Sequence, residues 1–186
     1  MIPPSNIAGA STPSKSIQWD SSWPKLVKDP ERGHLVEFFR RRFGIPGAIF
    51  SSYYLYRRGR TAWLVNKDER LHDLASLQVK SIGMPLLRWL GPHLKPTSVA
   101  LQLLGAHANK NIVTLTSAQL RDLVERREIK TEFAGTPGYV IVVSTSLIIG
   151  CALHLPGRLI SQFPRYMFTS QTWEYVLQGR IRRGVT

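Results

Sequence analysis

Apolar side chains along the chain follow two spacings, one typical of helices and the other of strands. From residue 30 to residue 43, apolar positions three and four apart predict an amphipathic helix that buries Leu35, Phe38, Phe39 and Phe43. Asp29 as N-cap and Pro30 at the first helical position predict where this helix starts. Gly44 predicts its end, because glycine readily adopts the left-handed conformation of a C-cap.

Two runs rich in aromatic and β-branched residues come next and predict a hairpin. Its strands cover residues 52–56 and 61–65, and the turn between them is Arg57-Arg58-Gly59-Arg60. A short helix or loop is expected at 68–75. We therefore expect a small α/β domain over residues 29–76, preceded by a flexible arm, residues 1–28, that is rich in Ser and Pro.

From residue 77 onward, short apolar runs alternate with turn residues, which predicts short strands and two short helices. The first helix follows Lys95-Pro96-Thr97, and the second begins at a capping box of Thr116 and Gln119. The helix that follows Thr97 is expected to bury Val99, Ala100, Leu103 and Leu104. Extended segments are expected at 77–82, 86–90, 111–115, 129–133, 139–143, 147–153 and 158–164. This pattern predicts an α+β chain whose second domain, residues 77–168, is a small mixed β-barrel, followed by a basic tail at 169–186.

Residues 138–155 form the longest apolar stretch and are about long enough to cross a membrane. Ser144, Thr145 and Ser146 interrupt the stretch at its centre, and β-branched residues are frequent on both sides. We therefore predict two buried strands joined by a turn, and no membrane partner. The first residues also lack the charged start and continuous apolar run of a secretion signal, so a cytoplasmic location is expected.

The charge of the chain is strongly unbalanced. Among 186 residues, 25 Lys and Arg stand against 12 Asp and Glu, which gives a net charge of +13 and a pI near 10.5. An apolar content of 43% supports a folded core and excludes disorder of the whole chain. The basic excess favours a polyanionic partner, nucleic acid before an anionic membrane, with solubility alone as the simpler alternative.

Catalytic and metal-binding patterns are missing from the sequence. No glycine-rich nucleotide loop follows a predicted strand, and the five histidines have no metal-ligand spacing. The single cysteine, Cys151, excludes an intramolecular disulfide and is typical of a small buried apolar residue. We therefore expect no enzymatic activity, no catalytic residue, no metal and no cofactor.

The positive charges lie where carboxylates are rare. No Asp or Glu occurs in residues 45–67, 74–121 or 133–173, so cations there would be available to phosphates. At one predicted helix start, Lys95, Thr97 and Ser98 could hold a phosphate, or Thr97 could be an ordinary N-cap. The hairpin tip carries Arg57, Arg58 and Arg60, which suit RNA backbone contact or simply keep the strand edge soluble.

The second domain resembles the PUA-like RNA-binding domain at the C-terminus of Sun/Fmu (RsmF-type) ribosomal RNA cytosine-5 methyltransferases. Four segments carry the resemblance in order: Leu94-Lys95-Pro96-Thr97 with Ala100-Leu101-Gln102, Lys110-Asn111-Ile112-Val113, Gly138-Tyr139-Val140-Ile141-Val142, and Gly150 followed by residues 157–165. The first domain looks like the small pre-PUA domain of several RNA-modifying and ribosome-assembly proteins. The resemblance implies RNA contacts at Lys95, Thr97, Lys110, Asn111, Gly138, Tyr139, Arg158 and Arg165.

The resemblance does not extend to catalysis. Those methyltransferases have a nucleotide-binding catalytic domain with two cysteines, whereas this chain has one cysteine and no such domain. The leading hypothesis is a stand-alone protein that binds structured ribosomal or transfer RNA and supports RNA modification or ribosome assembly. The alternative is a protein–protein adaptor for a separate rRNA methyltransferase or a ribosomal precursor, and an enzyme with an unrecognised site comes third.

Overall fold

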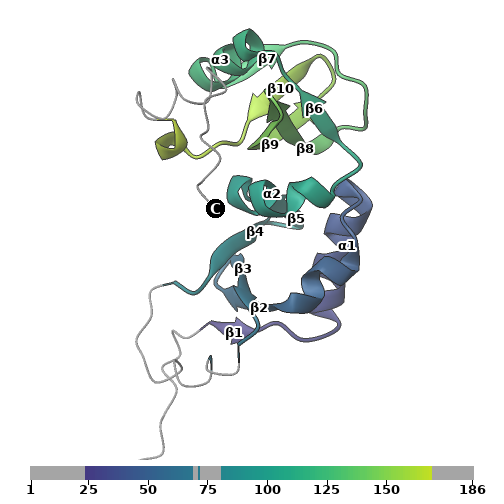
Figure 1. The fold of residues 1–186 in the computed structure, drawn as a ribbon, viewed down its shortest axis with the longest axis vertical. Helices are drawn as coiled ribbons and strands as arrows, with labels where there is room; N and C mark the ends of the chain where they lie inside the picture. Colours follow the sequence, from purple (N-terminus) through teal and green to yellow (C-terminus); the bar gives the residue numbers. More distant parts are fainter. Residues whose placement is uncertain (1–23, 69–70, 72–80, 169–186) are drawn as a thin grey trace, which may run out of the picture.

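A computed structural model describes residues 24–68, 71 and 81–168, which form an α+β fold as predicted (Figure 1). Most of the expected arm, most of the loop at 68–75, most of the strand at 77–82 and the whole basic tail lie outside the described residues. Two five-stranded sheets lie one above the other in this view, with helix α2 (Ser98–Leu104) between them.

The first sheet is antiparallel, and its strands follow one another in chain order. They are β1 (Lys25–Leu26), β2 (Tyr53–Arg58), β3 (Thr61–Asn66), β4 (Met84–Leu90) and β5 (His93–Pro96). The predicted hairpin is confirmed, with Tyr56 opposite Trp63, although the turn is shorter than expected because Arg57 and Arg58 belong to β2. Residues 25 and 26, placed in the flexible arm by the sequence, instead pair with β2.

Helix α1 (Glu31–Phe43) covers one face of this sheet, and a 3-10 helix (Gly47–Ser52) leads from it into β2. Leu35, Phe39 and Phe43 are buried and Phe38 is partly buried, so the predicted apolar face is confirmed. Gly44 ends the helix with a φ of 70°, the left-handed cap that the sequence predicts. The start differs by one residue: Pro30 is the N-cap, and Asp29 Oδ1 accepts a hydrogen bond from the Gly33 N–H at 3.1 Å.

The second sheet has the order β6-β8-β9-β10-β7. Its strands are β6 (Ile112–Thr114), β7 (Glu128–Lys130), β8 (Gly138–Ser144), β9 (Leu147–Leu155) and β10 (Arg158–Ser161), and a 3-10 helix (Arg165–Met167) follows. β6 runs parallel to β8, and the other pairs are antiparallel. Within the described residues β6 and β7 are the two edges of an open sheet, so the expected closed barrel is not found.

Helix α3 (Ser117–Glu125) begins at the predicted capping box, in which Thr116 Oγ1 accepts from the Gln119 N–H at 3.2 Å. The two strands predicted in residues 138–155 are confirmed as β8 and β9. Thr145 and Ser146 join them with φ values of 48° and 66°, the positive angles that a tight two-residue hairpin turn requires. None of the helices in the described segments has both the length and the hydropathy needed to cross a membrane.

The predicted division of the chain at residue 77 does not match the strand pairing. β4 and β5 lie after this point, yet β4 pairs with β3 and β5 with β4 in the first sheet. The physical reason is burial, because Leu86 and Leu87 of β4 are fully buried in the same core as Phe39 of α1. The first sheet therefore ends at Pro96, immediately before α2.

Helix α2 contributes to the core that α1 begins. Ala100, Leu101 and Leu104 are buried in one cluster that also includes Ile141 of β8 and Cys151 of β9. Leu103, expected on the buried face, is 46% exposed, and Leu101 is buried in its place. A 3-10 helix (Gly105–His107) continues from α2 toward β6, and a second cluster with Leu120, Leu159 and Phe163 fills the other side of the second sheet.

The close approach of α2 to β9 requires glycine at position 150. Gly150 has a φ of 150°, and a methyl group there would lie 2.7 Å from the Cβ atom of Ser98. We expect Gly150→Ala to lower the free energy of unfolding by about 2–3 kcal/mol, because overpacking forces the helix away from the strand. Urea denaturation measures this loss. Gly91→Ala is the control, since Gly91 also has a positive φ of 59° but no atom within 4 Å of the added methyl; a loss equal to that of the control would contradict the close-packing explanation.

Candidate nucleic-acid interface

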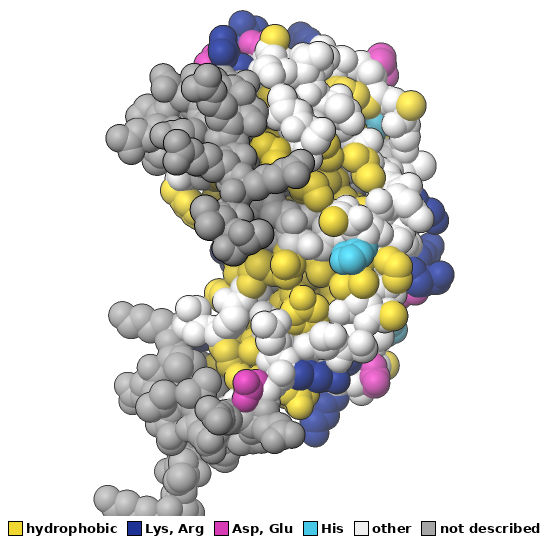
Figure 2. Space-filling view, viewed as in Figure 1, with side chains coloured by type: hydrophobic (Ala, Val, Ile, Leu, Met, Phe, Trp, Pro, Cys, Tyr) yellow, Lys and Arg dark blue, Asp and Glu magenta, His cyan; other side chains and the backbone are white. Residues whose placement is uncertain are grey.

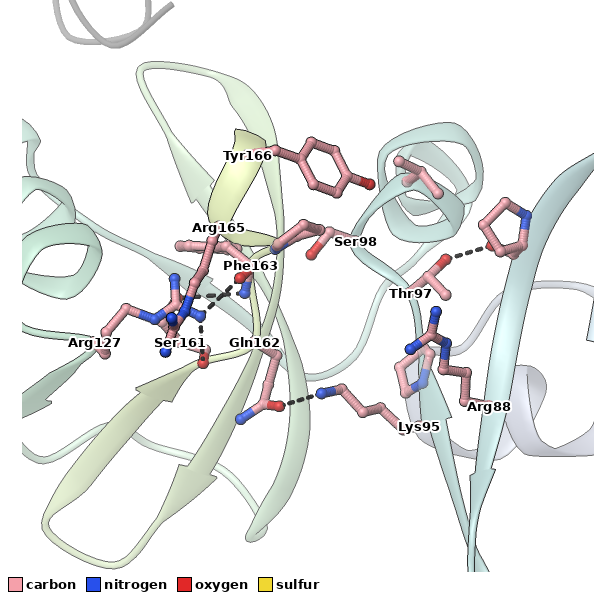
Figure 3. Close-up of a pocket in the computed structure, with 14 residues that line it drawn as sticks. Arg88, Lys95, Thr97, Ser98, Arg127, Ser161, Gln162, Phe163, Arg165 and Tyr166 are labelled. Atoms are coloured by element: carbon pink, nitrogen blue, oxygen red, sulfur yellow. Dashed lines mark hydrogen bonds between the residues drawn. The ribbon is translucent and has the colours of Figure 1, made fainter. Parts of the chain in front are cut away.

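A groove of about 390 Å³ lies where the two sheets meet at the start of α2 (Figure 3). One wall comes from β4 and β5 of the first sheet, and the other comes from the segment after β10 together with Arg127. Four cationic side chains line it: Arg88, Lys95, Arg127 and Arg165. No Asp or Glu of the described segments is among its lining residues.

Strand pairing positions the two cations of the first wall. Arg88 on β4 lies directly opposite Lys95 on β5, and opposite residues of an antiparallel pair point to the same side of a sheet. Arg88 is exposed, whereas Lys95 is partly buried. Burial lowers the pKa of Lys95, and the neighbouring charges of Arg88 and Arg127 lower it further. Like charges are therefore held together here at an electrostatic cost.

The second wall includes Arg127, which follows α3 and has a φ of 65°. Its Nη2 atom donates to the Phe163 carbonyl at 2.7 Å and, less closely, to the Ser161 carbonyl at 3.4 Å. These contacts hold the guanidinium beside the end of β10, next to Arg165. Burial lowers the pKa of Arg127, and the charge of Arg165 lowers it further.

A single hydrogen bond crosses the groove between the walls. Lys95 Nζ donates to Gln162 Oε1 at 2.5 Å (Figure 3). Because glutamine is neutral, this contact orients the ammonium group without cancelling its charge. The groove consequently presents positive charge from both sheets to any anion that enters it.

The predicted residues Thr97 and Ser98 lie at the groove, but their hydroxyls are engaged within the fold. The Thr97 hydroxyl donates to the Pro85 carbonyl and accepts from the Ala100 N–H at 3.1 Å, so Thr97 is the N-cap of α2. Ser98 Oγ accepts from the Cys151 N–H at 3.1 Å and is buried. With these groups occupied and only seven residues in α2, the positive character of the groove comes from its side chains.

Four other predicted residues, Lys110, Asn111, Gly138 and Tyr139, lie at a different place, where α1 meets the second sheet. Arg42 of α1 donates from Nε to the Tyr139 carbonyl at 2.6 Å, and its carbonyl accepts from Asn111 Nδ2 at 2.6 Å. A methyl group at Gly138 would lie 3.0 Å from the Arg42 guanidinium carbon. None of these four residues lines the groove, because they lie at the joint between α1 and β8.

The remaining predicted cations lie outside the groove. Arg57 forms an ion pair with Glu31 at 2.7 Å and stacks on the Trp89 ring at 4.4 Å, so its charge is partly compensated. Arg158 lies 3.7 Å from Glu128. Arg58 and Arg60 belong to the hairpin of β2 and β3 and are not among the lining residues of the groove. Of the twelve predicted residues, the structure brings four to the groove: Lys95, Thr97, Ser98 and Arg165.

Sequence reasoning missed six polar or aromatic residues of the groove, namely Arg88, Arg127, Ser161, Gln162, Phe163 and Tyr166. Arg88 was recognised only as one cation of an acid-free stretch, because residues 93–96 were not predicted as a strand that pairs with β4. Arg127 was not predicted as a phosphate-binding residue, because Glu125 and Glu128 lie close to it in the sequence. Gly91-Pro92, a turn dipeptide directly after the apolar run at 84–90, was a signal for a hairpin that would have placed Arg88 beside Lys95.

Cys151 is fully buried, as its sequence context predicts, and its pKa is raised to about 12 by that burial. An unfolded cysteine ionises near pH 8.5, so the thiol should be reactive at that pH only in the unfolded chain. We expect iodoacetamide at pH 8.5 to leave the native protein unmodified and to alkylate it in denaturant, as read by intact mass. Rapid alkylation of the native protein would contradict the buried position.

The part of the chain that the structure describes contains no group of three His, Cys, Asp or Glu side chains arranged to hold a metal ion. A scan of protein-family models and a search of curated proteins return no match to this chain. The function of the groove therefore follows from its own residues, charge and shape.

Proposed function

We propose that this chain is an RNA-binding protein that holds structured RNA, of the ribosomal or transfer type, in the groove between its two sheets. The observation that carries the proposal is the gathering of Arg88, Lys95, Arg127 and Arg165 without an acidic lining residue. On this proposal the chain itself performs no methyl transfer and supports RNA modification or ribosome assembly by positioning.

The electrostatics of the groove favour a phosphate-rich ligand. Burial is the main cause of the lowered pKa values of Lys95 and Arg127, and the neighbouring positive charges of Arg88, Arg127 and Arg165 add an unfavourable repulsion in the free protein. A phosphate between the walls would relieve this repulsion, and its counterions would be released to solvent. Guanidinium groups on both walls add the planar donors that suit phosphate oxygens.

We further propose that the second sheet with α2 and α3 is a PUA-like unit. Two segments that carry the resemblance, one near Lys95 and the other near Gln162 and Arg165, meet across the groove. Their meeting supports the view that the resemblance marks a shared RNA-contact region. The second sheet is open within the described residues, so the unit that we propose differs in this respect from the closed barrel expected from the sequence.

The proposal predicts a steep dependence of RNA affinity on salt. With four cations contacting phosphates, the logarithm of the association constant should fall with the logarithm of salt concentration at a slope of about −3 to −4. Fluorescence anisotropy with a labelled transfer RNA and a ribosomal hairpin, between 50 and about 300 mM salt, measures the slope. Affinity that does not change with salt would contradict an interface built on phosphate contacts.

The second candidate function is that of a protein adaptor for a separate rRNA methyltransferase or a ribosomal precursor. One observation favours it: Leu103 and Ile112 are large apolar side chains that remain exposed. In the space-filling view, apolar side chains also gather across the middle of the face shown, while Lys and Arg lie toward its ends and one edge (Figure 2). Leu103→Asp should abolish a complex of this kind and leave salt-dependent RNA affinity unchanged.

A further inference from the structure

The groove offers apolar surface as well as charge. Pro85, Pro96, Val99 and Pro164 line it between the cationic side chains, and Tyr166 lies at its rim. Tyr166 is 77% exposed, which is far more than an aromatic side chain packed in a core. In the close-up view its ring extends from the second wall toward the start of α2 (Figure 3). One pocket therefore combines donors for an anion with a free aromatic face.

The size of the groove limits what can enter it. A volume of about 390 Å³ is at the small end of the range found for small-molecule pockets. In an RNA duplex the bases are stacked inside and the phosphates lie outside, so a paired nucleotide cannot present both to one pocket. An unpaired nucleotide can be splayed out of the helix and can offer its base and its phosphate together.

Resting on the proposed RNA-binding function, we propose that the groove is a site for one unpaired nucleotide, with its base stacked on Tyr166 and its phosphate held between Arg88 and Lys95. The phosphate replaces Gln162 Oε1 as the partner of Lys95 Nζ. The amide of Gln162, released from that contact, is then available to a base edge. The chain accordingly prefers RNA that has a bulged or terminal unpaired nucleotide over a continuous duplex.

The test compares two RNA duplexes with the same paired sequence and blunt ends, one continuous and one with a single bulged uridine. Stacking on an aromatic side chain should make the bulged RNA bind about tenfold more tightly to the unaltered chain. Tyr166→Ala should remove this preference, so that the bulged and continuous RNAs bind with equal affinity, while Tyr166→Phe should keep it. Arg88→Ala should weaken binding of both RNAs, because it removes a phosphate contact.

Leu103→Ala is the matched control, since Leu103 is also a large exposed side chain but does not line the groove. Equal affinity of the unaltered chain for the two duplexes, or a preference that survives Tyr166→Ala, would overturn the nucleotide site. Either result, combined with salt-dependent binding, would leave the proposed RNA-binding function intact. If neither RNA binds in a salt-dependent manner, the proposed function itself has failed and the nucleotide site fails with it.

Discussion

Replacing Arg88 and Lys95 together by alanine should lower affinity for structured RNA about 100-fold in 0.1 M salt, because each loses a charge-assisted contact equivalent to about tenfold in affinity. The magnitude of the salt slope should fall by about 2, and different RNA sequences should be affected alike. Arg88 is exposed and Lys95 only partly buried, so the double variant should stay folded. Anisotropy titrations at several salt concentrations measure both effects.

Two lysines outside the groove provide controls, because replacing either one removes a single positive charge, as each groove substitution does. Lys130 is exposed on the edge strand β7, and Lys110 is exposed near the joint between α1 and the second sheet. Neither lines the groove, so Lys130→Ala and Lys110→Ala should each change affinity by no more than about threefold through long-range charge alone. If either control lost as much affinity as one of the groove variants, net charge rather than the groove would explain RNA binding.

The largest expected effect on stability comes from Phe39→Ala, which should lower the free energy of unfolding by about 3–5 kcal/mol. Phe39 is fully buried, and its ring lies 5.4 Å from that of Phe50 and 6.0 Å from that of Phe43, measured between centroids. Alanine would leave a cavity that these aromatic neighbours cannot fill. Leu103→Ala should cost about 0.5 kcal/mol or less, because its side chain is largely solvated.

This substitution also tests how the two sheets depend on each other. The cluster that contains Phe39 extends through Leu101 of α2 to Ile141 and Cys151 of the second sheet. We therefore expect Phe39→Ala to shift the unfolding of the whole described structure in a single transition. Two separate transitions in urea, with only one of them shifted, would show that the second sheet is stable without this shared core.

The local features of the fold could be predicted from sequence because short segments determine them. The capping box of Thr116 and Gln119 and the left-handed Gly44 each depend on a few neighbouring residues. The hairpin over β2 and β3 follows from two runs rich in aromatic and β-branched residues around a Gly-containing turn. In each case the residues that decide the structure are adjacent, so no knowledge of distant contacts is needed.

The predictions that failed concern features that depend on contacts between segments far apart in the sequence. Helix α2 lies between two sheets, so apolar periodicity alone does not show that Leu101 is buried while Leu103 is exposed. The groove likewise needs Arg88 and Lys95 from one wall and Arg127 from the other, a pairing that charge counts along the chain do not contain. Lys95 was predicted from its place at a helix start and from the resemblance, and Arg165 was predicted from the resemblance. Their arrangement across one groove came from the structure.

The most direct test of RNA binding in the groove is to crosslink a photoreactive RNA to the purified full chain and to identify the modified peptides by mass spectrometry. Crosslinks should concentrate in residues 95–99 and 161–166, which line the groove, and Arg88→Ala with Lys95→Ala should remove them. Crosslinks confined to the hairpin tip at residues 57–60, or to residues 110–111 and 138–139, would contradict the groove as the RNA site.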